Sequence, residues 1–215
     1  MPSSEVSLAL FVPLIAKSDR LEDVEGFLGK GYELVQDEEE TIQWMAAKYD
    51  DHTPPTFMIF DTFRAESGRN AHLTGKIAEA LMANADALLA AGPEIAKPTI
   101  LANNIGDPSK IKAGGLRNGL RVLLQAKSDK VQAVKEFLTG ALPLVEAEPE
   151  TLAWYALEFP GTKQFAIIDF FADDAGRNAH LTGEVAKALF ANAEELLSSP
   201  PDIKKITVVA ANVKV

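Results

Sequence analysis

The sequence contains no cysteine, which excludes disulfide bonds, thiolate nucleophiles and cysteine-ligated metal sites. Histidine is also scarce, with three in 215 residues, and none stands in a His-x-x-x-His or His-Glu-x-x-His spacing. No zinc or iron motif is therefore recognisable. We expect a protein without a metal or any other cofactor.

Basic residues are outnumbered, with 21 against 31 acidic ones and a net charge of -10. Nucleic acids and anionic membrane surfaces both attract proteins through basic groups, so the balance argues against either partner. No apolar run approaches the roughly 20 residues of a membrane-spanning helix. A signal peptide carries Lys or Arg before its apolar run, but the run Val6–Ala16 has neither before it. A similar run recurs in mid-chain, where no signal peptide can lie. We therefore expect a cytoplasmic protein.

What the sequence does contain is a tandem repeat. The eight residues Gly-Arg-Asn-Ala-His-Leu-Thr-Gly occur at 68–75 and recur unchanged at 176–183. The match continues in register on both sides of this shared block, and the copies differ in length only in one turn, where insertions belong. The sequence predicts a first copy at 1–105, a linker at 106–115 that contains the breakers Gly106-Asp-Pro-Ser and Gly114-Gly115, and a second copy at 116–215.

Each copy is expected to follow the order β-α-β-β-α-β, which is that of the ferredoxin-like fold. Asp19 and Asp129 are the expected N-caps of the first helices, and Thr74 and Thr182 those of the long last helices. The acidic run 37–40 is expected to be a solvated connection. The expected strands are 6–15, 41–49, 57–63 and 99–104 in the first copy, and 116–125, 151–159, 165–171 and 207–213 in the second.

The third strand of the first copy is apolar on both faces, which indicates a sheet that is buried on both sides. Helices can cover one face, and the sheet of the other copy can cover the second. We therefore predict an α+β protein in which two ferredoxin-like repeats form an intramolecular pseudo-dimeric α/β barrel.

Two motifs resemble those of the antibiotic biosynthesis monooxygenase family. They are Ile59-Phe-Asp-Thr-Phe63 followed by Gly68-Arg-Asn-Ala-His72-Leu, and Ile167-Ile-Asp-Phe-Phe171 followed by Gly176-Arg-Asn-Ala-His180-Leu. The resemblance covers both copies and implies a fused version of a homodimeric barrel, with further homo-oligomerisation left open. The family includes cofactor-independent quinone-forming monooxygenases, haem-degrading enzymes and members with no known reaction.

The resemblance implies a chemistry in which a phenol or hydroquinone is deprotonated and passes an electron to dioxygen. His72 and His180 are the predicted bases, because imidazole titrates near neutral pH. The site must also hold the phenolate oxygen and offer an apolar wall to a small aromatic substrate. The candidates for substrate binding are Trp44, Trp154, Tyr155, Asn70, Asn178, Arg69, Arg177, Asp61 and Asp169.

Every candidate also has a structural interpretation. The histidines then serve as hydrogen-bonded structural residues, the tryptophans as core residues, and the aspartates as buried partners of the nearby arginines. For the whole protein, the alternatives to an enzyme are a noncatalytic small-molecule binding protein that uses the same barrel and an interaction module whose barrel is filled. Because the copies differ at positions such as Met45 and Tyr155, one or both copies can carry the site.

Overall fold

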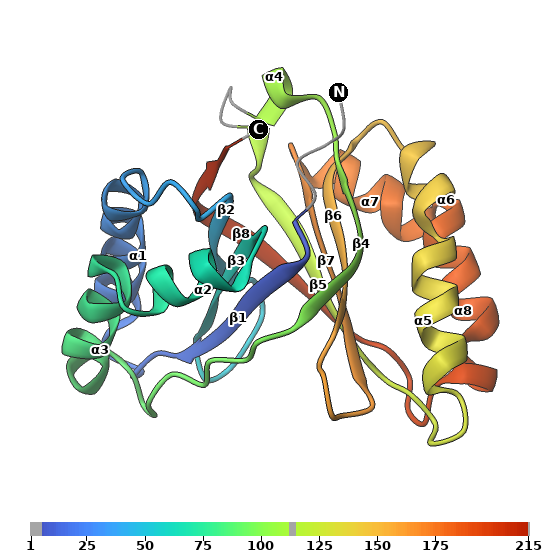
Figure 1. Ribbon diagram of the computed structural model, residues 1–215, viewed down its shortest axis with the longest axis horizontal. Coiled ribbons are helices and arrows are strands. Elements are labelled where there is room, and N and C mark those ends of the chain that lie inside the picture. Colours follow the sequence, from blue (N-terminus) through green and yellow to red (C-terminus); the bar gives the residue numbers. More distant parts are fainter. Residues whose placement is uncertain (1–5, 112–114, 215) are drawn as a thin grey trace. The chain divides into compact units, whose positions relative to one another are not determined.

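The computed structural model describes residues 6–111 and 115–214 (Figure 1). The ends of the two predicted copies, at 1–5 and 215, and part of the predicted linker, at 112–114, lie outside the described residues. In the described part of the chain, no helix is both long enough and apolar enough to cross a bilayer.

The order of helices and strands confirms the predicted repeat. The first copy contains β1 (Leu8–Ile15), α1 (Leu21–Val35), β2 (Gln43–Tyr49), β3 (Thr56–Phe63), α2 (Glu66–Leu73), α3 (Lys76–Leu88) and β4 (Thr99–Ile105). A short helix, α4 (Pro108–Lys110), follows in the linker. The second copy contains β5 (Asn118–Gln125), α5 (Val131–Gly140), α6 (Leu142–Glu146), β6 (Thr151–Glu158), β7 (Gln164–Phe171), α7 (Asp174–Thr182), α8 (Glu184–Leu196) and β8 (Asp202–Val213).

The predicted helix caps are wrong in both copies. Helix α1 follows Arg20 as its N-cap residue, and α5 follows Lys130, with no side-chain cap at either position. The hydroxyl of Thr74 donates to the carbonyl of Asn70, and Thr182 makes the matching bond to Asn178. The glycines that follow are the N-cap residues of α3 and α8. The threonines therefore close the helix that carries the shared block.

Antiparallel pairing on both sides of β3 places the centre of the candidate site. Asp61 on β3 lies opposite Leu10 on β1 and opposite Trp44 on β2. Directly opposed residues of neighbouring strands project to the same face of a sheet. The second copy repeats the arrangement, with Asp169 on β7 opposite Leu120 and Trp154. A carboxylate is thus set among apolar side chains on the sheet face that the helices cover.

The hydrogen-bonded strand order β1-β3-β2-β8-β5-β7-β6-β4 closes on itself, which confirms the predicted barrel topology. The compact units differ from the sequence copies in their last strands. One unit comprises residues up to 98 together with 207 onward, and the other comprises 99–206. Accordingly, β4 of the first copy pairs with β6 of the second. The unit that contains β1 to β3 is called the first unit, and the unit that contains β5 to β7 is called the second unit.

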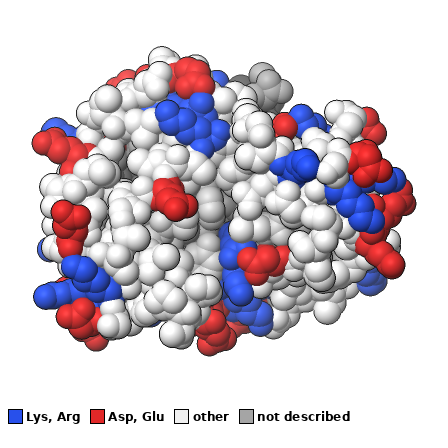
Figure 2. Space-filling view, turned by 90° about the horizontal axis from the view of Figure 1, so that it is seen from below, with Lys and Arg blue, Asp and Glu red and all other residues white. Residues whose placement is uncertain are grey.

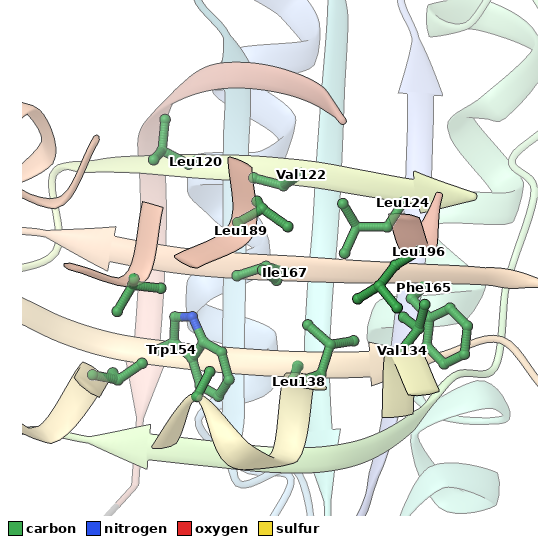
Figure 3. Packing of buried hydrophobic residues seen from close by; sticks show 14 of the residues in the cluster. Leu120, Val122, Leu124, Val134, Leu138, Trp154, Phe165, Ile167, Leu189 and Leu196 are labelled. Carbon is green, nitrogen blue, oxygen red and sulfur yellow. The ribbon is translucent and has the colours of Figure 1, made fainter. Parts of the chain in front are cut away.

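Burial is complete along the central strands, as predicted from their two apolar faces. All residues of β3 are buried, and those of β7 are buried after its first residue. In the second unit, leucines and valines of β5, α5 and α8 enclose Trp154 and Phe165 (Figure 3). On the face of the molecule in Figure 2, the Lys and Arg side chains are interspersed with Asp and Glu.

Candidate functional site

A cavity of about 180 Å³ lies within the first unit, between the sheet and the helices. Asp61 and His72 are the polar groups at its inner part, whereas Lys30 and Ile95 line it where the surface is exposed. The remainder of the wall is apolar and comes from three strands and three helices. It includes Leu10, Val12, Phe27, Leu28, Gly31, Leu34, Trp44, Ile59, Leu73, Ile77, Ala78, Ala80 and Leu81.

His72 has a carboxylate at each ring nitrogen. Its Nδ1 lies 2.6 Å from Oε2 of Glu38, and its Nε2 lies 3.6 Å from Oδ2 of Asp61. The hydroxyl of Thr41 is 3.2 Å from the same Nδ1 and also donates to Glu38. Helix α2 presents the imidazole, which is buried with 7% of its side-chain surface exposed. The ring therefore occupies a fixed position between Asp61 and Glu38.

The buried carboxylate and the imidazole change each other's protonation. Burial raises the pKa of Asp61 to about 7, although the neighbouring charge of His72 opposes this rise. Burial by itself lowers the pKa of His72, but the carboxylates of Asp61 and Glu38 outweigh it, so the pKa lies above its usual value. The carboxylates thus favour the charged form of the imidazole, while burial favours the neutral form of Asp61.

The second unit contains the same three groups. His180 Nδ1 lies 2.6 Å from Oε2 of Glu148, and Nε2 lies 3.3 Å from Oδ2 of Asp169. Burial lowers the pKa of His180, yet Asp169 and Glu148 outweigh this effect and raise it to about 10. The adjoining cavity measures only about 20 Å³. The polar groups of the two copies are thus equivalent, whereas the space beside them is not.

The helix that covers Trp44 accounts for part of this difference. Helix α1 continues through Gly31, whose missing side chain lets the backbone approach the indole. In the second copy the equivalent residue is Ala141, which is buried, and the helix is interrupted there before Pro143. Trp44 lines the larger cavity, whereas Phe190 is among the residues that enclose the smaller one.

The predicted arginine and asparagine residues lie away from both cavities. Arg69 is buried and donates to the carbonyl of Ala9 and to Glu66. Arg177 likewise donates to backbone carbonyls, those of Gly119 and Ile206. These bonds attach the helix of the shared block to the sheet. Asn70 and Asn178 are exposed, and none of the four side chains lines either cavity.

The aromatic candidates divide between the two sheet faces. Trp44 lines the first cavity, and its buried Nε1 has no hydrogen-bond acceptor among the described residues. Trp154 is fully buried and belongs to the packed core of the second unit (Figure 3). Tyr155 follows it on β6 and so projects to the opposite sheet face, where burial raises the pKa of its phenol. It does not line the helix-side cavity of its own unit.

Sequence reasoning missed Glu38 and Glu148. The run 37–40 was expected to be solvated, but the Glu38 side chain is 18% exposed and contacts His72. The recurrence of a Glu and a Thr three residues apart in both copies was the available signal, since Glu38 and Thr41 recur as Glu148 and Thr151. The expected pairing of the buried aspartates with the nearby arginines is wrong. The histidines face these carboxylates, and the arginines bond to other groups.

An open groove of about 550 Å³ lies on the other side of His72. It is lined by Glu38, Thr41, Gly68, Gly75 and Lys76, together with the histidine itself. The imidazole thus separates the apolar cavity from a polar surface groove. Within the described residues, no group of three or more His, Asp or Glu side chains is arranged to hold a metal ion.

Solved structures share this fold at low sequence identity. A putative monooxygenase from Fusobacterium nucleatum aligns with a TM-score of 0.84 at 11% identity, covering 97% of this chain and 95% of that one. A second one, from Lactobacillus acidophilus, aligns with a TM-score of 0.79 at 12% identity, covering 98% and 97%. An uncharacterised ferredoxin-fold protein from Listeria monocytogenes, described as related to antibiotic biosynthesis monooxygenases, aligns with a TM-score of 0.54 at 7% identity, covering 95% of each.

No protein-family model matches the sequence, and no curated protein matches it either. The fold-level comparisons nevertheless agree with the resemblance in the shared motifs, because the alignments extend over nearly the whole length of both chains. The chain thus has the ferredoxin-like barrel fold found in relatives of the antibiotic biosynthesis monooxygenases, in tandem-duplicated form.

Proposed function

We propose that this protein is a cofactor-independent monooxygenase that oxidises a single-ring phenol or hydroquinone with dioxygen in the cavity of the first unit. The observation that carries the proposal is the juxtaposition of Asp61 and His72 at the inner part of a mostly apolar cavity beside Trp44. Such a site offers a proton acceptor, a positive charge to hold a phenolate and an aromatic wall.

The size of the cavity limits the substrate. About 180 Å³ is close to the ~150 Å³ of an engineered apolar cavity that binds benzene. A single aromatic ring with one or two hydroxyl groups therefore fits, whereas fused rings require the wall to move. The about 20 Å³ in the second unit has no room for a ring, so we assign one working site to each chain.

The proposed reaction balances without a further reductant. The phenol loses its proton to the site, and the resulting phenolate transfers electrons to dioxygen. One oxygen atom enters the ring, and the other leaves as water, so that a phenol and dioxygen yield a quinone and water. The substrate supplies all four electrons, which is why its electron-rich ring is essential and the protein only has to hold, deprotonate and enclose it.

Oxygen uptake by the metal-stripped protein with a panel of hydroquinones and phenols tests the proposal. Isotope-labelled dioxygen should place one labelled atom in the quinone and one in water. A His72→Ala, His180→Ala double variant should lose the uptake while remaining folded by circular dichroism. The matched control is His52→Ala, because His52 lies in the β2–β3 turn and bonds the carbonyl of Pro54.

The outcomes separate enzyme from binding protein. Histidine-dependent uptake with label in the quinone supports the monooxygenase. Tight binding of single-ring phenols without turnover favours the noncatalytic alternative, in which the same cavity only stores a ligand. The same cluster occurs in the second unit beside almost no space, so its presence does not by itself imply catalysis.

A further inference from the structure

Asp61 combines two features that do not normally occur together. Its side chain is 1% exposed, yet neither of its carboxylate oxygens has a hydrogen-bond donor among the described residues. His72 Nε2 is the nearby cation, but at 3.6 Å it is too far for a normal hydrogen bond. Because an unpaired buried carboxylate is costly, such a group indicates a position that a ligand donor completes. Asp61 lines the cavity, so the missing donor would come from the cavity.

The geometry of His72 limits its own role as a base. A neutral imidazole has one N–H donor and one acceptor nitrogen. With carboxylates at both nitrogens, a neutral ring would direct a lone pair at a carboxylate oxygen. The doubly protonated ring avoids this, since it presents an N–H to Glu38 and another to Asp61. An imidazolium has no free lone pair, and so it cannot accept the proton of a phenol.

From these contacts we propose that Asp61 accepts the hydroxyl proton of the substrate, and that His72, held as an imidazolium by Glu38, is a positioning residue that stays charged. This assignment rests on the proposed function for its substrate class, a phenol or hydroquinone of one ring. It replaces His72 as the predicted base.

The proton transfer is balanced in charge as well as in atoms. Before transfer, the cavity holds an Asp61 carboxylate, a His72 imidazolium and a neutral phenol. Afterwards, it holds an Asp61 carboxylic acid, the same imidazolium and a phenolate. The negative charge moves from Asp61 to the substrate oxygen and remains beside the imidazolium. The pKa of Asp61, which burial raises to about 7, suits a base that works near neutral pH.

Other charged groups near His72 do not compete for this role. Glu38 and Thr41 face its Nδ1 from the connection between α1 and β2, on the side of the outer groove. Lys214, beyond β8, donates to the backbone carbonyl of Glu38. Lys76 from α3 lines the groove, and Lys30 from α1 lines the exposed part of the cavity. Asp61 is the carboxylate that lines the cavity.

The test uses 4-nitrophenol, a coloured single-ring phenol whose ionised form has its own absorption band. The wild-type protein should bind it as the phenolate at a pH where the free probe is mostly neutral. Asp61→Asn, which is nearly isosteric, has no acceptor for this proton, so its bound probe should lose the phenolate band as the pH falls, whereas the wild-type band should persist. Asp169→Asn is the matched control, because it makes the same change beside a cavity with no room for the ring, and it should retain the phenolate spectrum.

Two further measurements identify the role of each residue. Asp61→Asn should lower oxygen uptake by roughly 100-fold or more, the usual contribution of a general base. Nitrogen NMR of the His72 ring, in a chain with only three histidines, should show both nitrogens protonated at neutral pH. Glu38→Gln should lower the pH at which this ring loses its proton, which a residue that only fills space would not do.

The outcomes distinguish this assignment from the proposed function. Phenolate binding that depends on Asp61, without oxygen uptake for any substrate, would retain the proton acceptor and reject the monooxygenase. Oxygen uptake together with a wild-type phenolate spectrum in Asp61→Asn would retain the enzyme and overturn the assignment. A neutral His72 ring at neutral pH, or a probe that fails to bind the wild-type protein, would also overturn it.

Discussion

A methyl group added to Gly31 would lie 3.2 Å from Cζ2 and 3.3 Å from Cη2 of Trp44. The indole that forms one wall of the cavity therefore depends on a glycine in the helix above it. The second copy has Ala141 at this position, beside a much smaller cavity. This relationship predicts that a single methyl group alters the capacity of the first site.

We expect Gly31→Ala to displace the Trp44 ring into the cavity and to weaken binding of single-ring phenols by roughly tenfold, since overpacking costs about 1–3 kcal/mol. Titration with 4-nitrophenol measures this. Gly29→Ala is the matched control in the same helix, because a methyl group there meets nothing within 4 Å. It should leave affinity unchanged and stabilise the helix by roughly 0.5–1 kcal/mol. Equal affinity in both variants would contradict the role of Gly31.

The sequence was sufficient to predict most of the fold. The repeat, the apolar character of both faces of β3 and the turn between β2 and β3 determine the element order and the buried sheet. The exchange of the last strands was not predictable, because pairing of β4 with β6 depends on tertiary packing that no local pattern specifies.

The candidate site was predicted in part. The shared block identified His72, and the apolar strand around Asp61 marked that carboxylate as unusual. The role of Glu38 was not predicted, because this residue stands in a run of four acidic residues, which usually indicates a solvated surface. The difference between the two cavities also could not be predicted. It depends on how α1 and the interrupted helix at Ala141 pack over the sheet, and volume is a result of packing rather than of periodicity.

The two histidines should differ in their effect on activity. His72→Ala should reduce oxygen uptake by roughly 100-fold or more, because it removes the charge that holds the phenolate. His180→Ala should retain uptake, because the cavity beside it has no room for a ring. Both variants remove the same contacts to a Glu and an Asp, so each controls for the stability cost of the other. Comparable losses of uptake in the two folded variants would show that both copies work.

Loss of the His180 proton should make the fold less stable at alkaline pH. Burial lowers its pKa, but Asp169 and Glu148 outweigh this and raise it to about 10, above the ~6.5 of an unfolded chain. The folded state thus binds this proton more tightly, so the stabilisation is complete below about pH 6.5 and is lost as the pH rises towards 10. The loss amounts to at most about 1.4 kcal/mol for each pH unit in this range.

Urea denaturation across this pH range measures the effect. The free energy of unfolding of His180→Gln should fall less steeply with pH than that of the wild-type protein, and His72, whose pKa is also raised, contributes to the remaining slope. His52→Gln, in the β2–β3 turn, should retain the wild-type slope. A wild-type slope in His180→Gln would mean that the imidazole is not charged in the folded protein.

Ring number should determine which substrates are oxidised. With about 180 Å³ available, we expect single-ring hydroquinones to be oxidised faster than naphthols, and three-ring phenols to be excluded. Leu81→Ala should enlarge the cavity at its α3 side and shift the preference towards two rings, at a cost of about 2–5 kcal/mol in stability. Leu189→Ala is the matched control, because it makes the equivalent change in the second unit and should leave the preference unchanged. If Leu189→Ala, rather than Leu81→Ala, admitted naphthols, the working cavity would lie in the second unit.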